Sequence, residues 1–257
     1  MPIQKAILLS AGKGSRLLPL TADRPKCLIE FSGKSLLEWQ LDTLLAAGIG
    51  EIVVVTGFRE ELVEAVAATR AGVRTLFNPF YHVADNLGSV WMARHELSGE
   101  LLLLNGDTLV SPALLARVLA AGGGPIAVTT DEKPSYDADD MKVLTEGDRL
   151  LRIGKTLEAG LYNGESIGLL AFRGGGAGQF AAKVEAMMRR PEGTRRWYLR
   201  AIDELAQEGA DVRTVSIRGE DWQEVDFPED LARAEALTAR WAASITAEED
   251  APRAMRL

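Results

Sequence analysis

The stretch LLSAGKGSRLLPLTADRPKCL, residues 8–28, places a glycine-rich turn and several basic side chains directly behind a short apolar run. Gly12 and Gly14 can adopt backbone angles that are closed to other residues, and they let the main chain approach a ligand closely. Four basic residues of the stretch can neutralise phosphate charge, namely Lys13, Arg16, Arg24 and Lys26. The pattern predicts a buried strand that leads into a phosphate-binding loop.

Two common phosphate-binding motifs do not fit this spacing. A dinucleotide-binding G-x-G-x-x-G would need glycine at position 17, where Leu17 stands, so an NAD-dependent oxidoreductase is a weak alternative. Residues 33–35, GKS, imitate the end of a P-loop, but the first glycine of that motif would fall on Leu28. Ser35 followed by Glu38 is better interpreted as a helix capping box.

Short and nearly continuous apolar runs alternate with amphipathic stretches along the chain. We expect strands at residues 3–9, 52–56, 73–77, 101–104 and 126–130. We expect helices at residues 36–47, 60–69, 87–97, 112–120, 177–189 and 228–242. The alternation predicts an α/β fold with a mixed, mostly parallel sheet that helices cover on both faces.

The strand-like pieces become shorter between residues 131 and 172, where glycine and acidic residues separate them. They cover residues 141–144, 150–153 and 166–172, and they predict a small antiparallel insertion beside the sheet. We therefore expect one domain over residues 1–242 that contains the insertion at 131–172, followed by a tail at 243–257.

Composition excludes several classes of protein. The chain has 257 residues and a formal net charge of −8, which argues against a general nucleic-acid or anionic-membrane surface. Basic charge is nevertheless concentrated in residues 1–34, which hold six Lys or Arg and two acids. Cys27 is the only cysteine and His82 and His95 are the only histidines, so neither a disulfide framework nor a Cys/His zinc site can form. We expect a reducing cytoplasm and no membrane span, because no apolar run approaches about 18 residues.

The segment AGKGSRLLPLTADRPK, residues 11–26, resembles the signature of nucleotidyltransferases that join a nucleoside triphosphate to a phosphorylated small molecule and release pyrophosphate. The resemblance implies a Rossmann-like (GT-A-type) three-layer sandwich in which the insertion covers the acceptor. It implies that Lys13 and Arg16 contact the triphosphate and that Lys26 lies between the two reacting phosphates. The nucleotide would also contact Ser10, Ala11, Gly12, Gly14 and Gly106.

Two aspartates are candidate ligands for Mg²⁺. The segment LLLLNGD, residues 101–107, places Asp107 just beyond the carboxyl end of a predicted strand, where open α/β sheets bind ligands. Carboxylates suit Mg²⁺, a hard cation that bridges to nucleotide phosphates. The family has a metal-binding aspartate at this point, and the resemblance implies Asp226 in WQEVDFPEDL, residues 222–231, as the second. Asp226 before Pro228 and Glu229 is also typical of a helix start.

The middle segments resemble the phosphocholine-type cytidylyltransferases. DNLGSVWMARHEL, residues 85–97, resembles their helix entry, which implies that Asn86 and Ser89 lie near base and ribose and that the triphosphate is CTP. DDMKV, IGK and GESIGLLAF extend the resemblance and imply that Lys142 and Lys155 reach the acceptor phosphate and that Glu165 orients an amine or ribose. The alternatives are exposed strand lysines and a turn glutamate.

An acceptor with an ammonium group would suit a wall of aromatic faces. The candidates are Tyr136, Trp197, Tyr198 and Trp222, although such rings are also typical of a core. RRWYLRAIDEL, residues 195–205, lacks the acid that related enzymes often have after the aromatic residue, so a choline-like acceptor stays open.

These features together predict transfer of a nucleotidyl group, CMP from CTP, to a small phosphorylated or phosphonate acceptor. The main rivals are a sugar-1-phosphate uridylyl-, thymidylyl- or guanylyltransferase and a catalytically silent nucleotide-binding regulator on the same fold. We expect no nucleic-acid or membrane partner, and the sequence leaves a homodimer open.

Overall fold

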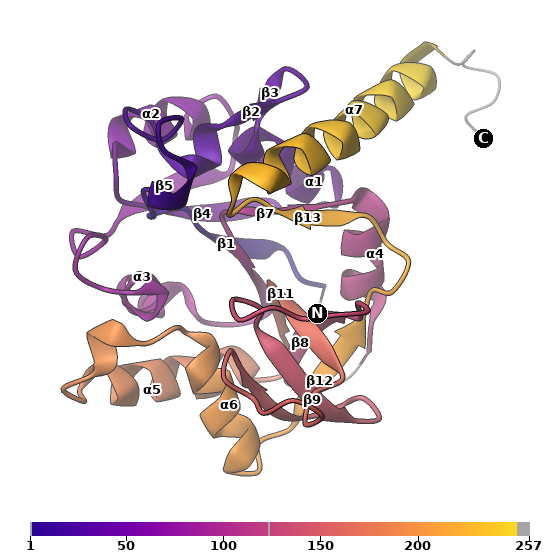
Figure 1. Ribbon diagram of the computed structural model, residues 1–257. Coiled ribbons are helices and arrows are strands. Elements are labelled where there is room, and N and C mark those ends of the chain that lie inside the picture. Colours follow the sequence, from indigo (N-terminus) through magenta and orange to yellow (C-terminus); the bar gives the residue numbers. More distant parts are fainter. Residues whose placement is uncertain (1, 123, 251–257) are drawn as a thin grey trace.

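The structure, a computed structural model, describes residues 2–122 and 124–250 and is built around a nine-stranded sheet (Figure 1). The strands lie in the order β5-β4-β1-β6-β11-β8-β12-β10-β9. Their bounds are β1 Lys5–Leu9, β4 Glu51–Thr56, β5 Val73–Phe77, β6 Leu101–Asn105, β8 Ile126–Asp131, β9 Lys142–Glu146, β10 Arg149–Gly154, β11 Gly164–Phe172 and β12 Val212–Ser216. Only β10 and β11 run against the other seven, so the predicted mixed, mostly parallel sheet is confirmed.

Helices cover both faces of the sheet because successive residues of a strand point to opposite faces and both sets of side chains are apolar. Ile7 of β1 joins one core cluster with Val53 and Leu103, whereas Leu8 joins the other with Val54. The first face is covered by α3 Asn86–Met92, α5 Gly176–Met188 and α6 Leu199–Gln207. The second face is covered by α1 Leu36–Ala46, α2 Glu60–Ala67 and α4 Pro112–Ala120. The result is the predicted three-layer α/β sandwich.

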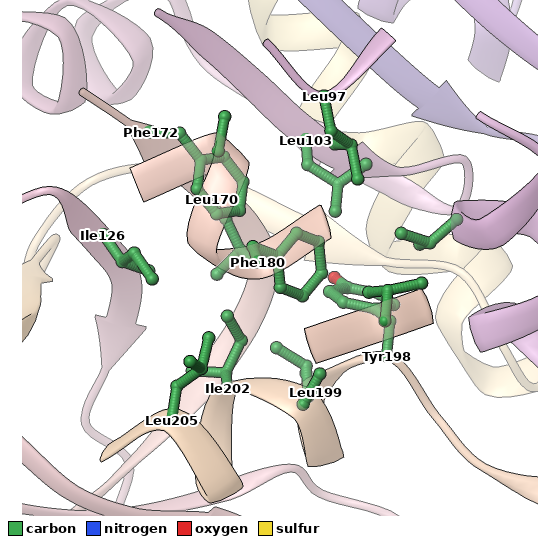
Figure 2. Close-up of a cluster of buried hydrophobic side chains, with 14 of the residues drawn as sticks. Leu97, Leu103, Ile126, Leu170, Phe172, Phe180, Tyr198, Leu199, Ile202 and Leu205 are labelled. Atoms are coloured by element: carbon green, nitrogen blue, oxygen red, sulfur yellow. The ribbon is translucent and has the colours of Figure 1, made fainter. Parts of the chain in front are cut away.

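The first core cluster contains large aromatic side chains. Figure 2 shows Phe180 of α5 among side chains from β11 and α6, and its ring stacks on Phe172 with the centroids 5.1 Å apart. The Tyr198 ring meets Phe180 edge to face at 6.4 Å and is fully buried. Each such side chain contributes roughly 1.5–3 kcal/mol through removal of apolar surface from water.

A third core cluster includes side chains of the last helix, α7 Pro228–Asp250, which is drawn in yellow in Figure 1. It joins α7 to α1 and to two small sheets made of β2 Glu30–Phe31 with β3 Lys34–Ser35, and of β7 Thr108–Val110 with β13 Trp222–Glu224. Trp39 and Trp241 meet edge to face at 5.9 Å. Helix α7 continues past residue 242, where the prediction ended it, and residues 251–257 of the predicted tail lie outside the described residues.

The predicted insertion at 131–172 proves to supply three strands of the nine-stranded sheet, β9, β10 and β11. The β9–β10 hairpin is the added part, whereas β11 returns between β6 and β8. Lys142 of β9 pairs with both Gly154 and Glu165, which ties the hairpin back to β11. Gly168 bends β11 at a φ of +76°, and a Cβ there would come within 2.3 Å of the Asn105 amide.

Most predicted elements are present with ends that differ by a few residues. The capping box is confirmed, because Ser35 Oγ accepts from the Glu38 N–H while Glu38 accepts from the Ser35 N–H. The helix predicted at 87–97 ends at Met92 and a 3₁₀ turn follows. The 3₁₀ turns are Ser15–Leu17, Lys26–Leu28, Arg94–Glu96 and Gly193–Arg195. None of the described helices is both long and apolar enough to cross a bilayer.

Candidate active site

The loop after β1 forms one wall of a cavity of about 190 Å³, here called the glycine-loop cavity. Its lining is Leu9, Ser10, Ala11, Gly12, Gly14, Lys26, Cys27, Tyr81, Ala84, Asn86, Ser89, Asn105, Gly106 and Asp107. All seven residues that the sequence predicted around the nucleotide are in this set. The structure thus brings them together, and their contact with a nucleotide stays a prediction.

Glycine is required at two positions of this wall by close approach. Gly14 has a φ of +73°, and a Cβ there would lie 2.7 Å from the Lys26 Cβ. A Cβ on Gly106 would lie 2.5 Å from both the Leu9 carbonyl oxygen and the Ser10 hydroxyl oxygen. The Thr21 hydroxyl donates to the Gly14 carbonyl at 2.8 Å. The signature loop therefore folds back onto Lys26 and holds its stem.

Lys26 lies among carboxylates at the carboxyl edge of the sheet. Its ammonium donates to Asp107 Oδ2 at 2.7 Å and to Asp226 Oδ1. Burial alone would lower the pKa of Lys26, but these two carboxylates outweigh it and raise that pKa. One oxygen each of Asp107, Glu224 and Asp226 lies within 4.8 Å of the others, and we call these three residues the carboxylate cluster. Loss of water around Glu224, with repulsion from the other two carboxylates, raises its pKa well above the usual value.

The carboxylate cluster fits a hard divalent cation. Three carboxyl groups converge from β13 and the segments after β6 and β13, and carboxylate oxygens are the ligands that Mg²⁺ prefers. Sequence reasoning missed Glu224. Glu224 and Asp226 are two residues apart at the end of a strand, a spacing that puts side chains on one face, and this signal could have found it.

Asp226 is free to face Lys26 because another residue caps α7. Asp230 Oδ2 accepts from the backbone N–H of Asp226 at 3.0 Å and of Phe227 at 2.8 Å. The helix start that the sequence placed at Asp226 is therefore satisfied by Asp230, three to four residues later. The Asp226 carboxylate instead contacts Lys26 and, at 3.3 Å, Arg16 Nη1.

The remaining basic residues of the signature have different positions. Arg16 lies over the Phe227 ring at 4.9 Å, and Asp139 accepts from its guanidinium at 2.6 Å. Lys13 is exposed, its ammonium lies 5.2 Å from the Phe58 ring centroid, and it lines neither the glycine-loop cavity nor an adjoining cavity of about 530 Å³. Arg24 contacts its neighbour Asp23 and also lines neither cavity. Arg16 and Lys26 are thus the two basic residues placed at the carboxylate cluster.

A second cavity of about 530 Å³ adjoins the first, and we call it the acid-lined cavity. Its acidic lining is Asp107, Asp131, Asp137, Asp139, Asp140, Glu165, Glu224, Asp226 and Asp230. Its basic lining is Arg16, Lys133, Lys155 and Arg233. Asn86, Asn105 and Asp107 line both cavities, so the two spaces meet at the carboxylate cluster.

Three of the five residues predicted for the acceptor line this cavity, namely Lys155, Glu165 and Trp197. Lys142 does not, because the carbonyls of Asp137, Asp140 and Lys155 accept from its ammonium. Tyr136 also lies outside the lining, and its hydroxyl accepts from the Lys133 N–H at 3.3 Å.

The other two aromatic residues proposed for the acceptor wall have different positions. Trp222 lines the acid-lined cavity and donates to Asp131 Oδ2 at 2.7 Å. Tyr198 is part of the core, and its hydroxyl donates to Asn105 Oδ1 at 2.9 Å. The alternative reading of Tyr198 as a core residue is therefore the one that the structure supports.

Glu165 is one of the buried acids of the acid-lined cavity. Burial raises the pKa of its carboxyl to about 7, although the Lys133 ammonium at 2.9 Å works in the opposite direction. Lys133 also contacts Asp140 Oδ1 at 2.7 Å, so one ammonium serves two carboxylates. Basic side chains of the protein itself cover two aromatic rings of the cavity, since the Lys155 ammonium lies 4.7 Å from the Trp197 centroid and the Arg16 guanidinium lies 4.9 Å from the Phe227 centroid.

The chain was compared with known proteins. A Streptomyces rubellomurinus protein named CMP-5'-(3-aminopropyl)phosphonate synthase is 32% identical over 242 residues, which are 90% of this chain and 38% of that protein. A Rubrobacter xylanophilus protein named bifunctional IPC transferase and DIPP synthase is 32% identical over 243 residues, 93% of this chain and 53% of that protein. The chain thus spans between about a third and about a half of the length of these relatives.

Solved structures share the fold. The CTP:phosphocholine cytidylyltransferase of Streptococcus pneumoniae superposes with a TM-score of 0.78 at 21% identity, over 93% of this chain and all of that one. The family described as the MobA-like NTP transferase domain matches residues 6–249, which include the signature loop and the carboxylate cluster. The chain belongs to this nucleotidyltransferase family, as the signature at residues 11–26 predicted.

Proposed function

We propose that the protein transfers CMP from CTP to a small acceptor that carries a phosphate or phosphonate group, with release of pyrophosphate. The observation that carries the proposal is the position of the carboxylate cluster and Lys26 where the glycine-loop cavity meets the acid-lined cavity. Two substrates in adjoining cavities would meet at a point that already holds the charges needed to stabilise a phosphoryl transfer.

The choice of cytidine and of a phosphonate is supported by a relative. The Streptomyces protein, 32% identical to this chain, is named for a CMP-linked aminopropylphosphonate. An ammonium group on the acceptor also suits the acid-lined cavity, where nine carboxylates face four basic side chains. An aromatic cage for a quaternary ammonium has less support, because Lys155 already covers the Trp197 face.

The mechanism follows from the need to bring two anions together. An oxygen of the acceptor attacks the α-phosphorus in line with the leaving pyrophosphate, and this oxygen is already ionised near neutral pH, so no protein base is needed. Arg16 and Lys26 neutralise phosphate charge and position the reacting groups, while exposed Lys13 can extend to the triphosphate from the rim. Mg²⁺ held by the carboxylate cluster supplies further charge neutralisation when bound.

Pyrophosphate release tests the proposal. Four nucleoside triphosphates are each assayed with 3-aminopropylphosphonate, 2-aminoethylphosphonate, phosphocholine and hexose 1-phosphates, with MgCl₂ or EDTA. We expect Mg²⁺-dependent release with CTP and an aminophosphonate. Release with UTP, dTTP or GTP and a hexose 1-phosphate would support the sugar-nucleotide rival, and no release with any pair would support a silent nucleotide-binding regulator.

A matched pair of variants tests the site itself. Asp107→Asn removes one charge from the carboxylate cluster and should abolish release while the fold is kept. Asp148→Asn removes one charge from an exposed acid that pairs with Arg213, and should leave turnover unchanged. Normal turnover of Asp107→Asn would refute the assignment of this carboxylate.

A further inference from the structure

Asp139 contacts two basic side chains of the acid-lined cavity at once. Its Oδ2 accepts from Arg16 Nη1 at 2.6 Å, and its Oδ1 accepts from the Lys155 ammonium at 2.5 Å. Arg16 belongs to the loop after β1, Lys155 follows β10, and Asp139 lies between β8 and β9. Three separate segments of the chain therefore meet at one carboxylate.

The two basic groups have the geometry of an anion site. Each is directed at a different oxygen of the same group, which is how paired donors hold a phosphate or a carboxylate. Arg16 Nη1 also lies 3.3 Å from Asp226 Oδ2, so the position adjoins the carboxylate cluster. A phosphonate between Arg16 and Lys155 would lie beside the groups that promote the transfer.

We propose that Asp139 is an internal competitor of the acceptor's phosphate or phosphonate group for Arg16 and Lys155. The Asp139 carboxylate must rotate away before the acceptor anion can contact both basic groups. The inference rests on the proposed function, because it takes the acceptor to be such an anion. Asp139 would then compete with the acceptor's anionic group instead of binding the acceptor's ammonium group.

The turn that carries Asp139 can keep its conformation when the carboxylate leaves. Asp137 Oδ1 accepts from the N–H groups of Asp139 and Asp140, and Asp140 Oδ2 accepts from the Asp137 N–H. The Lys142 ammonium donates to the Asp137 carbonyl. None of these hydrogen bonds uses the Asp139 side chain, so rotation about its own bonds is sufficient.

The contacts of Asp139 are also weak enough to be exchanged. The Asp139 and Arg16 side chains are 31% and 49% exposed, and an ion pair that water reaches in this way contributes little. The Lys155 side chain is 18% exposed, so its contact is the more protected of the two. A phosphate or phosphonate presents three oxygens and up to two charges, which allows more hydrogen bonds to the same two donors. The larger number of oxygens and charges favours exchange of the carboxylate for the acceptor anion.

The test is an equilibrium titration of the full chain with methylphosphonate, which has no ammonium group. ³¹P NMR monitors the binding. Asp139→Asn should lower the dissociation constant by roughly threefold or more, since the competing charge is gone. Asp139→Glu keeps the charge and should stay near wild type, and Asp148→Asn should leave the constant unchanged. In turnover assays Asp139→Asn should lower KM for the acceptor and leave kcat at or above the wild-type value.

Unchanged or weaker methylphosphonate binding in Asp139→Asn would overturn the proposal, as would a raised KM for an aminophosphonate. Asp139→Ser serves as a second variant if the asparagine protein does not fold, and the same decrease is expected. The titration needs no turnover, so it separates this inference from the proposed function. A wild-type protein without transferase activity would leave the methylphosphonate result fully interpretable.

Discussion

Replacement of Lys26 by methionine should make the stability of the protein depend on a divalent cation. Lys26→Met keeps the length and apolar stem of the side chain but removes the ammonium. Asp107 and Asp226 then lose their shared partner, and Glu224 adds a third carboxylate within 4.8 Å. The variant should therefore be less stable than wild type in EDTA and should recover when MgCl₂ is added.

The magnitude follows from the exposure of the groups. Loss of one partner from a fully buried ion pair costs about 3–5 kcal/mol, and loss from an exposed pair costs about 0.2–1 kcal/mol. The side chains of Lys26, Asp107 and Asp226 are 14%, 20% and 23% exposed, so the loss of stability should be smaller than for a fully buried ion pair. We expect about 2–4 kcal/mol, or a decrease in Tm of about 5–15 °C for a domain of this size.

Thermal unfolding with EDTA and with MgCl₂ measures the effect, and Lys183→Met is the matched control. The Lys183 side chain is 12% exposed, similar to that of Lys26, but its ammonium pairs with Glu208, which is 58% exposed. The control should lose less than about 1 kcal/mol and show no dependence on Mg²⁺. Equal stability of Lys26→Met and wild type in EDTA would refute the reasoning, and so would a deficit that MgCl₂ does not reduce.

Three further predictions concern single positions. Burial raises the folded-state pKa of Glu165 to about 7 from an ordinary 4.5, so the folded protein holds this proton more tightly than the unfolded chain. The stability of the wild type relative to Glu165→Gln should therefore fall as pH rises from about 4.5 to 7, and it should then level off. Urea titrations across that pH range measure the difference. Gly14→Ala should cost about 1–2 kcal/mol because of the φ of +73° and the contact of its Cβ with Lys26, and guanidinium denaturation that shows no loss would contradict this. Asp230→Ala should lower the free energy of unfolding by about 1 kcal/mol and weaken stabilisation by Mg²⁺, because it releases the backbone of Asp226. Asp230→Asn retains a hydrogen-bond acceptor, so its loss of stability should be smaller in the same thermal unfolding assay.

The strands and most helices could be predicted because their patterns are local. Strands that are buried on both faces give continuous apolar runs, and the capping box at Ser35 and Glu38 marks its helix without tertiary context. Helix α6 and strand β12 were missed, although neither is shorter than several elements that were predicted. LRAIDELAQ carries a charged residue, Asp203, among its buried positions, and VRTVS is only partly buried, so neither gives a clean apolar pattern. Their identity depends on the core against which they pack.

The site could be predicted best where a motif fixes a residue to the carboxyl edge of the sheet. Asp107 follows β6 directly, and Lys26 is held by the turn at Gly14, so local sequence places both. Lys142 could not be placed in this way, because its ammonium is directed by the carbonyls of the turn at Asp137. The contact of Arg16 with Asp139 joins residues 123 positions apart and depends on how the insertion closes over the loop.

Lys26 and Asp139 hold opposite charges at the two places where ligand charge is expected. The Lys26 ammonium bridges carboxylates that fit a cation, and the Asp139 carboxylate bridges basic groups that fit an anion. A ligand at either place replaces a group of its own sign, so the local charge changes little. Because uncompensated charge in a partly buried site is costly, this arrangement keeps Arg16 and the carboxylate cluster in position before substrates bind. Loss of Lys26 should therefore increase the demand for a cation, and loss of Asp139 should increase the demand for an anion.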